Sequence, residues 1–131
     1  MFLDASALTA ILAPEEDGEA LADRLAGVEH CLVSALAIWE TTVALARIRQ
    51  SPIEVAKTLV DEFLAEIGAE ILPIDTAIGA IALDAFARFG KGRHPAALNM
   101  GDCFAYACAK AQGQPLLCKG DDFAQTDIRR A

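Results

Sequence analysis

FLDASALTAIL, residues 2–12, sets the architecture of this chain, because an apolar strand runs directly into a helix within it. Met1 to Leu3 is a short apolar run typical of a buried strand. Ala5 to Leu12 is typical of a short helix, which Pro14 closes. Asp4 stands at the junction, where a carboxylate also suits a helix N-terminus. The segment therefore predicts a buried strand that brings an aspartate to the start of a helix.

The same strand-to-helix unit recurs along the chain. Further strands are predicted at residues 31–33, 70–72 and 116–118, and further helices at 15–26, 34–49, 51–68, 75–89 and 101–112. Ser34 and Asp75 are predicted to cap the helices that they open. The tetrapeptide Ser51-Pro52-Ile53-Glu54 resembles a capping box with proline at the first helical position. Strands that alternate with helices predict one α/β domain over residues 1–131, with a mostly parallel sheet.

Length and composition limit the possible classes of protein. The chain has 131 residues, of which 54% are hydrophobic and 23% charged, so it has material for one folded core. No apolar run reaches the roughly 20 residues of a membrane helix, and the N-terminus lacks the basic segment of a signal peptide. We expect a cytoplasmic protein with no membrane partner. The four cysteines form no C-x-x-C pair and have no zinc-site spacing with His30 or His94, which predicts reduced, structural cysteines.

The net charge of −8, from 11 basic and 19 acidic residues, argues against a nucleic-acid partner. Binding of phosphates favours a basic surface. One interpretation is an acidic protein with no such partner. The other is that some carboxylates are ligands for a metal ion, so that the formal charge overstates the repulsion an RNA meets. Composition alone leaves both interpretations open.

Three carboxylates stand among apolar neighbours. Asp4 ends the first strand, Glu40 lies inside a helix with apolar residues at the i±3 and i±4 positions of its face, and Asp102 opens a helix. In parallel sheets, ligands gather at the carboxyl ends of the strands. Two carboxylates about 4 Å apart repel by roughly 4 kcal/mol at an effective dielectric constant near 20. A cluster of this kind must take up protons or hold a cation, and Mg²⁺ and Mn²⁺ prefer oxygen ligands.

Each carboxylate also has a purely structural interpretation. Asp4 is suited to capping the helix that follows it, and Asp102 gains from the dipole of the helix that it opens. Glu40 is compatible with a buried arginine partner. A metal-bound cluster would support phosphodiester hydrolysis, because the ion activates water and stabilises charge on phosphate. Taken singly, the three residues do not decide between these interpretations.

Four segments together resemble the PIN domain and, within that family, the VapC toxins. They are Phe2-Leu3-Asp4-Ala5-Ser6-Ala7, Glu40 in the helix after Ser34, Asn99-Met100-Gly101-Asp102-Cys103-Phe104-Ala105-Tyr106-Ala107, and Leu116-Leu117-Cys118-Lys119-Gly120-Asp121-Asp122-Phe123. They span essentially the whole chain in the family's order. The resemblance implies a Rossmann-like three-layer sandwich and an acidic pocket for Mg²⁺ or Mn²⁺. It also implies an endoribonuclease toxin of a VapBC-type toxin–antitoxin system, acting on single-stranded or loop RNA.

The resemblance also implies roles for individual residues. Asp4 and Asp102 would hold the main metal ion, with Glu40 and an aspartate of Gly120-Asp121-Asp122-Phe123 as further or water-mediated ligands. Asp121 is the favoured fourth acid and Asp122 a close second. Ser6 resembles the small hydroxyl residue that supports the site by hydrogen bonding, although packing in the first helical turn explains it equally well.

A basic set of residues, Arg88, Lys91, Arg93 and Lys119, is predicted to guide RNA phosphates, unless the loop charges only solubilise the chain. His94 is a weaker candidate for a catalytic base. The family binds a VapB-like antitoxin whose C-terminal segment crosses the pocket, often with an arginine among the acids. The resemblance therefore implies a homodimer, and a heterotetramer or larger assembly with the antitoxin. Trp39 and Phe63 are candidate anchors for these partners, although positions in the core are favoured for both.

Other functional classes fit the sequence less well. A phosphatase with an aspartyl nucleophile needs a second aspartate two residues after the first, where Ser6 stands, and a phosphotransfer receiver needs paired acids near the first strand. A catalytically silent antitoxin-binding module of the same fold remains the main alternative. The sequence leaves open the RNA target and whether one metal ion or two are bound.

Overall fold

The computed structural model describes residues 1–131 and contains a four-stranded, entirely parallel sheet. Its strands are β1 (Phe2–Leu3), β2 (Leu32–Ser34), β3 (Glu70–Leu72) and β4 (Leu116–Leu117), in the spatial order β3-β2-β1-β4. Phe2 is in register with Leu32 on one side and with Leu116 on the other. Arg130 in the C-terminal tail bridges Leu116 in parallel and extends the sheet beyond β4. The parallel sheet that the sequence predicts is confirmed.

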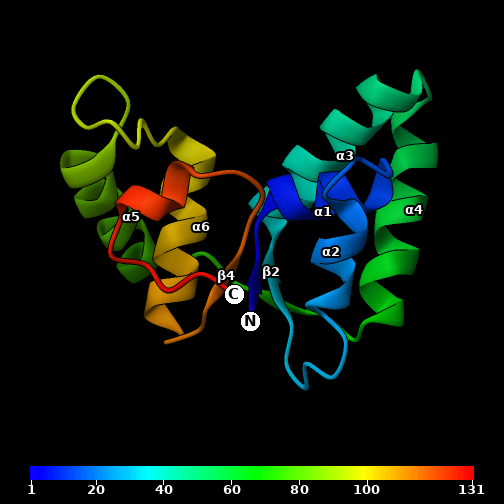
Figure 1. Cartoon of the computed structure of the whole chain (residues 1–131), viewed down its shortest axis with the longest axis horizontal. Helices are drawn as coiled ribbons and strands as arrows, with labels where there is room; N and C mark the ends of the chain where they lie inside the picture. The colour runs from blue at the N-terminus through cyan, green and yellow to red at the C-terminus, as the bar shows by residue number, and fades with distance from the viewer.

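Helices cover both faces of the sheet, which makes three layers (Figure 1). On one face lie α1 (Ala5–Leu12), α2 (Gly18–Asp23), α3 (Ala35–Arg49) and α4 (Ile53–Glu66); on the other lie α5 (Thr76–Phe89), α6 (Met100–Ala111) and the 3₁₀ helix η1 (Asp122–Gln125). Phe2 and Leu116 belong to the core under α5 and α6, whereas Leu3 and Leu117 belong to the core under α1–α4. This alternation follows from the period of two along a strand. None of the helices has the length and apolar character needed to span a bilayer.

Side-chain caps start most of the long helices where the sequence predicts. The backbone N–H of Ala37 donates to Ser34 Oγ at 3.1 Å, and the N–H of Ile78 donates to an Asp75 carboxylate oxygen at 2.9 Å. Asp4 caps α1 by accepting from the N–H of Ser6 at 3.0 Å. These caps are confirmed, and all four cysteines are free and buried.

Two local predictions are wrong for physical reasons. The predicted helix at 15–26 is only α2, because Glu15 N–H bonds to Ala10 O and Gly18 N–H bonds to Glu15 O in a turn that closes against α1. The predicted capping box does not form: α4 begins after Pro52, and the buried Ser51 hydroxyl has no partner. The N–H of Ser51 bonds back to Ala46 O, so Ser51 terminates α3 and does not cap α4.

Of the two aromatic residues expected in the core, one is exposed and the other is partly buried. Trp39 is 63% exposed on α3, so its favoured placement in the core is wrong. Phe63 on α4 is partly buried and packs against the core under α1–α4, as favoured.

Candidate functional site

An open pocket of about 320 Å³ lies at the carboxyl ends of the strands and brings distant segments together. Asp4 reaches it from the end of β1, Glu40 from α3, Asp102 from α6 and Lys119 from the residues after β4. Ser6 also lines it. The three carboxylates singled out in the sequence thus face one pocket, here named the acid pocket.

Asp4 is held by a short chain of hydrogen bonds. Its side chain is buried, with the residue 4% exposed, and one carboxylate oxygen accepts from both the N–H and the hydroxyl of Ser6. The Ser6 hydroxyl oxygen in turn accepts from the N–H of Lys119 at 3.0 Å. Burial raises the pKa of the Asp4 carboxyl, against the opposing effect of the Ser6 hydrogen bonds. Ser6 therefore joins the end of β1 to the end of β4 and orients the carboxylate between them.

Asp102 is oriented by a reciprocal cap at the start of α6. The N–H of Asn99 donates to Asp102 Oδ2 at 2.9 Å, and the N–H of Asp102 donates to Asn99 Oδ1 at 3.0 Å. The other carboxylate oxygen, Oδ1, takes no part in this cap. Burial, with repulsion from Asp4 and Asp122, raises the pKa of Asp102 to about 6, although the Asn99 hydrogen bond acts in the opposite direction. The predicted structural role and a role in the pocket are thus compatible.

The Glu40 side chain reaches from α3 to the first turn of α6. A Cβ atom added to Gly101 would lie 2.7 Å from both Cδ and Oε2 of the Glu40 carboxylate and closer still to Oε1. Gly101 is therefore the residue that leaves room for this carboxylate. Burial is the main cause that raises the pKa of Glu40 to about 7, with further contributions from the charges of Asp4 and Asp102.

No protein cation neutralises these three acids. The salt bridges of the structure include none to Asp4, Glu40 or Asp102, so the arginine partner considered for Glu40 is not there. Lys119, although it lines the acid pocket, pairs with Glu15 and Asp17. No group of three acidic, histidine or cysteine side chains forms a ready-made metal cage. The acids instead face a common space, which suits an ion held by a few carboxylates together with water and a substrate phosphate.

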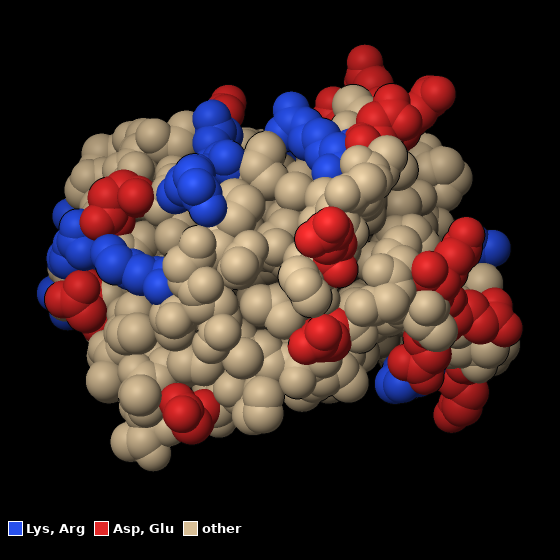
Figure 2. Space-filling model, turned by 90° about the horizontal axis from the view of Figure 1, so that it is seen from below, with Lys and Arg blue, Asp and Glu red and all other residues tan.

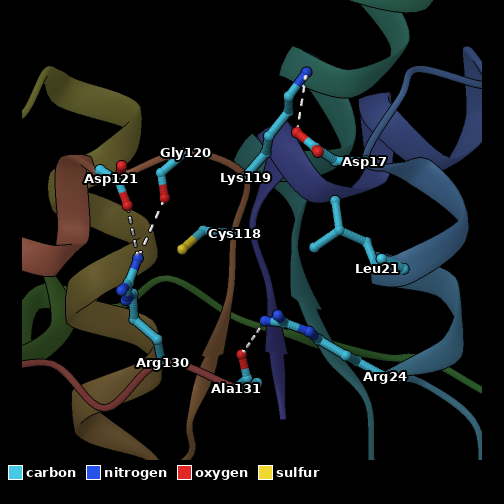
Figure 3. Close-up of a pocket in the computed structure, with 10 residues that line it drawn as sticks. Asp17, Leu21, Arg24, Cys118, Lys119, Gly120, Asp121, Arg130 and Ala131 are labelled. Atoms are coloured by element: carbon cyan, nitrogen blue, oxygen red, sulfur yellow. Dashed lines mark hydrogen bonds and ion pairs between the residues drawn. The ribbon is translucent and has the colours of Figure 1, made fainter.

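The two adjacent aspartates of the last motif interact with different groups. The Asp121 side chain is 94% exposed and lies 3.5 Å from Arg130 Nη1, in a second pocket outside the acid pocket (Figure 3). The charge of Asp122 raises the pKa of both Asp4 and Asp102. Although Asp121 is favoured from the sequence, Asp122 is the aspartate whose charge is felt in the acid pocket.

The residues predicted to guide RNA have mostly local partners. Arg88 donates to Asp127 at 3.1 Å, and Arg93 lies over the Phe86 ring with 5.3 Å between its guanidinium carbon and the ring centroid. Lys91 is exposed in the loop.

His94, the weaker candidate for a catalytic base, is held within the same loop. Its Nδ1 accepts from the N–H of Ala96 at 3.1 Å, and its ring packs edge-on against Phe89. Of the predicted basic set, Lys119 is the residue that lines the acid pocket.

Two residues that position the pocket acids escape prediction from the sequence. Asn99 forms the cap that orients Asp102, and its signal is the N-x-x-D spacing, which is typical of a capping box. Gly101 makes room for Glu40, but a single glycine in a helical segment carries no signal of which side chain approaches it.

Comparison with known proteins gives one family. A PIN domain model matches residues 1–129. The chain is 45% identical to a VapC ribonuclease of Rhizobium meliloti (strain 1021), in an alignment covering 97% of this chain and 98% of that protein. It is 40% identical to Ribonuclease VapC36 of Mycobacterium tuberculosis, over 98% of this chain and 91% of the relative. It is 39% identical to Ribonuclease VapC28 of the same species, over 100% and 97% respectively. The similarity therefore includes every segment that lines the acid pocket.

Proposed function

The chain belongs to the PIN domain family and, within it, to the VapC ribonucleases, and from this premise we propose that it is a metal-dependent endoribonuclease. We assign it the role of toxin in a VapBC-type toxin–antitoxin pair that acts in the cytoplasm. One observation carries the assignment: buried Asp4 faces Glu40 and Asp102 across a pocket that contains no cation paired with any of them. RNA is the substrate that the names of the relatives give.

The donors of the acid pocket fit a hard divalent cation. Carboxylate oxygens are the ligands that Mg²⁺ and Mn²⁺ prefer. Burial and, secondarily, the charges of Asp4 and Asp102 raise the pKa of Glu40, and a positive charge placed between the acids offsets both effects. We assign Asp4 and Asp102 as the main ligands of Mg²⁺, with Mn²⁺ as an alternative, and Glu40 and Asp122 as further or water-mediated ligands. When bound, such an ion activates water and stabilises charge on a phosphate.

The chain's own residues hold this arrangement in place. Ser6 fixes the orientation of the Asp4 carboxylate, and the reciprocal cap with Asn99 fixes that of Asp102. Gly101 admits the Glu40 carboxylate from the opposite helix. Partners of this kind, which orient the ligands themselves, commonly change metal affinity or activity by about 10- to 100-fold when removed. The proposed chemistry therefore depends on these supports as well as on the acids.

RNA cleavage by the purified protein tests the assignment. We expect cleavage in Mg²⁺, none in chelator, and loss of cleavage in Asp4→Asn and Asp102→Asn. Glu62→Gln is the matched control, because it neutralises an exposed acid on α4 outside the pocket. Equal cleavage by wild type and both pocket variants would place the activity elsewhere. A wild type that binds its antitoxin but cleaves no RNA with either ion would instead indicate the catalytically silent binding module.

We further propose a VapB-like antitoxin and a second copy of this chain as partners, in a heterotetramer or larger assembly. Leu83 and Phe86 on α5 and Met100 at the start of α6 lie exposed around one apolar hollow, and Trp39 lies exposed separately on α3. Exposed apolar surface of this kind marks interaction sites in folded proteins. Light scattering of the protein with and without its antitoxin measures both associations. A protein that stays monomeric and does not bind the antitoxin would contradict both proposals.

A further inference from the structure

A second pocket, of about 650 Å³ (Figure 3), shares Lys119 with the acid pocket. It lies between α2 and the C-terminal tail, and Lys119 lines both hollows. Arg24 enters it from α2 and Arg130 from the tail, while Gly120 and Asp121 form its upper wall. We name it the basic pocket. The N–H of Lys119 bonds to Ser6, which in turn bonds to Asp4, so the two pockets meet at the site proposed for catalysis.

Basic side chains are scarce in this chain, and three of its 11 lysines and arginines line this pocket together with two acids, Asp17 and Asp121. Asp17 pairs with Lys119 and Asp121 with Arg130, whereas Arg24 pairs with no acidic side chain. At the end of the molecule formed by α3 and α4, acidic side chains predominate on the surface. Seen from below, acidic side chains gather over that end (Figure 2), where α4 exposes Glu54, Asp61, Glu62 and Glu66. A polyanion is repelled by like charge and attracted by focused positive charge. The basic pocket is therefore a favourable approach for RNA to the acid pocket.

The guanidinium groups of the basic pocket have partners that a phosphate can replace. Arg24 Nη1 donates to the backbone oxygen of Ala131 at 2.6 Å. Arg130 Nη1 donates at longer distances, to Gly120 O at 3.3 Å and to Asp121 Oδ1 at 3.5 Å. Guanidinium groups bind phosphate through charge-assisted and often bidentate hydrogen bonds, which are stronger than bonds to neutral carbonyls. Exchange of the Gly120 carbonyl oxygen for a phosphate is therefore favourable, whereas the Asp121 carboxylate competes with phosphate for Arg130.

The lining of the basic pocket selects the part of RNA that it takes. It contains no aromatic side chain on which a base could stack. Gly120 has φ 82° and open space where a Cβ atom would stand, so the backbone here is accessible to a ligand. The volume falls within the range of about 300–1,000 Å³ that is usual for ligand sites. Charge without stacking indicates contact with sugar and phosphate, independent of base sequence.

We infer that the basic pocket binds the sugar–phosphate backbone of the RNA strand beside the scissile bond, with Arg24 and Arg130 as phosphate ligands. This inference rests on the proposed ribonuclease function and adds a substrate subsite to it. It also gives Asp121 a role different from that of a metal ligand, because Asp121 competes with phosphate for Arg130.

Binding of a labelled single-stranded RNA tests the inference without any need for cleavage. Fluorescence anisotropy is measured against salt concentration for the full chain carrying Asp102→Asn. Removing one phosphate contact lowers the slope of log affinity against log salt by about 0.7, which corresponds to about fivefold weaker binding at 0.1 M salt. We expect this for Arg24→Gln and for Arg130→Gln, and about 25-fold for both together. Asp121→Asn should act in the opposite sense and tighten binding.

Arg49→Gln is the matched control, because Arg49 is exposed at the end of α3, outside both pockets. The conservative variants Arg24→Lys and Arg130→Lys keep the charge and separate loss of binding from loss of folding, which a thermal melt monitors. Unchanged affinity and slope in the double variant, or equal losses in Arg49→Gln, would overturn the inference. In a parallel cleavage assay without Asp102→Asn, the double variant should raise KM and leave kcat unchanged. A wild type that binds RNA through these arginines but does not cleave it would overturn the ribonuclease proposal and leave the phosphate site standing.

Discussion

Replacing Glu40 with glutamine should stabilise the metal-free protein at neutral and higher pH. Glu40 has a pKa of about 7 in the fold, against 4.5 in the unfolded chain, chiefly because of burial and secondarily because of Asp4 and Asp102. For an acid whose pKa is raised on folding, the stabilising contribution is present below the unfolded value and is lost as pH rises through the folded value. The wild type should therefore lose stability between about pH 4.5 and pH 7. Glu40→Gln removes the group that titrates.

The size of the effect follows from the same values. A shift between these two pKa values corresponds to about 3 kcal/mol for a fully buried group. Glu40 is only half-buried, so solvent screening reduces this to about 1–2 kcal/mol. With a urea m-value of about 1–3 kcal/mol/M, the unfolding midpoint of Glu40→Gln should lie about 1 M above that of the wild type at high pH.

Urea unfolding followed by circular dichroism in chelator measures this difference. Wild type and variant should have similar midpoints near pH 4.5 and separate progressively up to about pH 7. Adding Mg²⁺ should narrow the gap, because binding to the folded state adds stability and the wild type has one more proposed ligand for the ion than the variant. Glu62→Gln, on the exposed face of α4, should show no such separation. A Glu40→Gln protein no more stable than wild type at pH 8, with normal folding, would refute the view that burial and the other pocket acids raise the pKa of Glu40.

Two further predictions concern residues around the acids. Gly101→Ala should push the Glu40 carboxylate away from α6. We expect kcat for RNA cleavage to fall by about 10- to 100-fold, because small displacements of reacting groups lower the rate strongly. A variant with wild-type kcat would show that the carboxylate moves freely. Asp122→Asn should raise the Mg²⁺ concentration that gives the half-maximal rate of cleavage, because it removes a proposed ligand. Asp121→Asn should leave that concentration unchanged. The reverse result would restore Asp121 as the fourth acid.

The positions of Asp4, Glu40 and Asp102 could be predicted because they depend on simple periodicities. A strand followed at once by a helix places Asp4 at the carboxyl end of the sheet, and apolar neighbours at i±3 and i±4 place Glu40 on a covered face of α3. The capping preferences of Ser34 and Asp75 are equally local, and both caps form. Features of this kind are decided within a few residues of chain.

Other features depend on contacts that no local pattern records. Ser51 has the composition of a cap, but its backbone is already used to end α3. Asp121 and Asp122 have the same chemistry, but Asp121 pairs with Arg130 in the basic pocket, whereas the charge of Asp122 acts on Asp4 and Asp102. Trp39 has the character of a core residue, yet α3 packs through other positions of its surface and leaves the indole outside. The pairing of Lys119 with Glu15 and Asp17 likewise appears only in three dimensions.

The adjacency of β1 and β4 makes the acid pocket depend on segments that lie far apart in the sequence. Phe2 N–H bonds to Pro115 O, and the amino group of Met1 bonds to the Gln114 side chain. A chain synthesised only as far as α5 lacks Asp102 and also β4, the strand that pairs with β1 beside Asp4. The acids of the pocket can therefore come together only after β4 has been translated, and a nascent chain up to that point has no complete site.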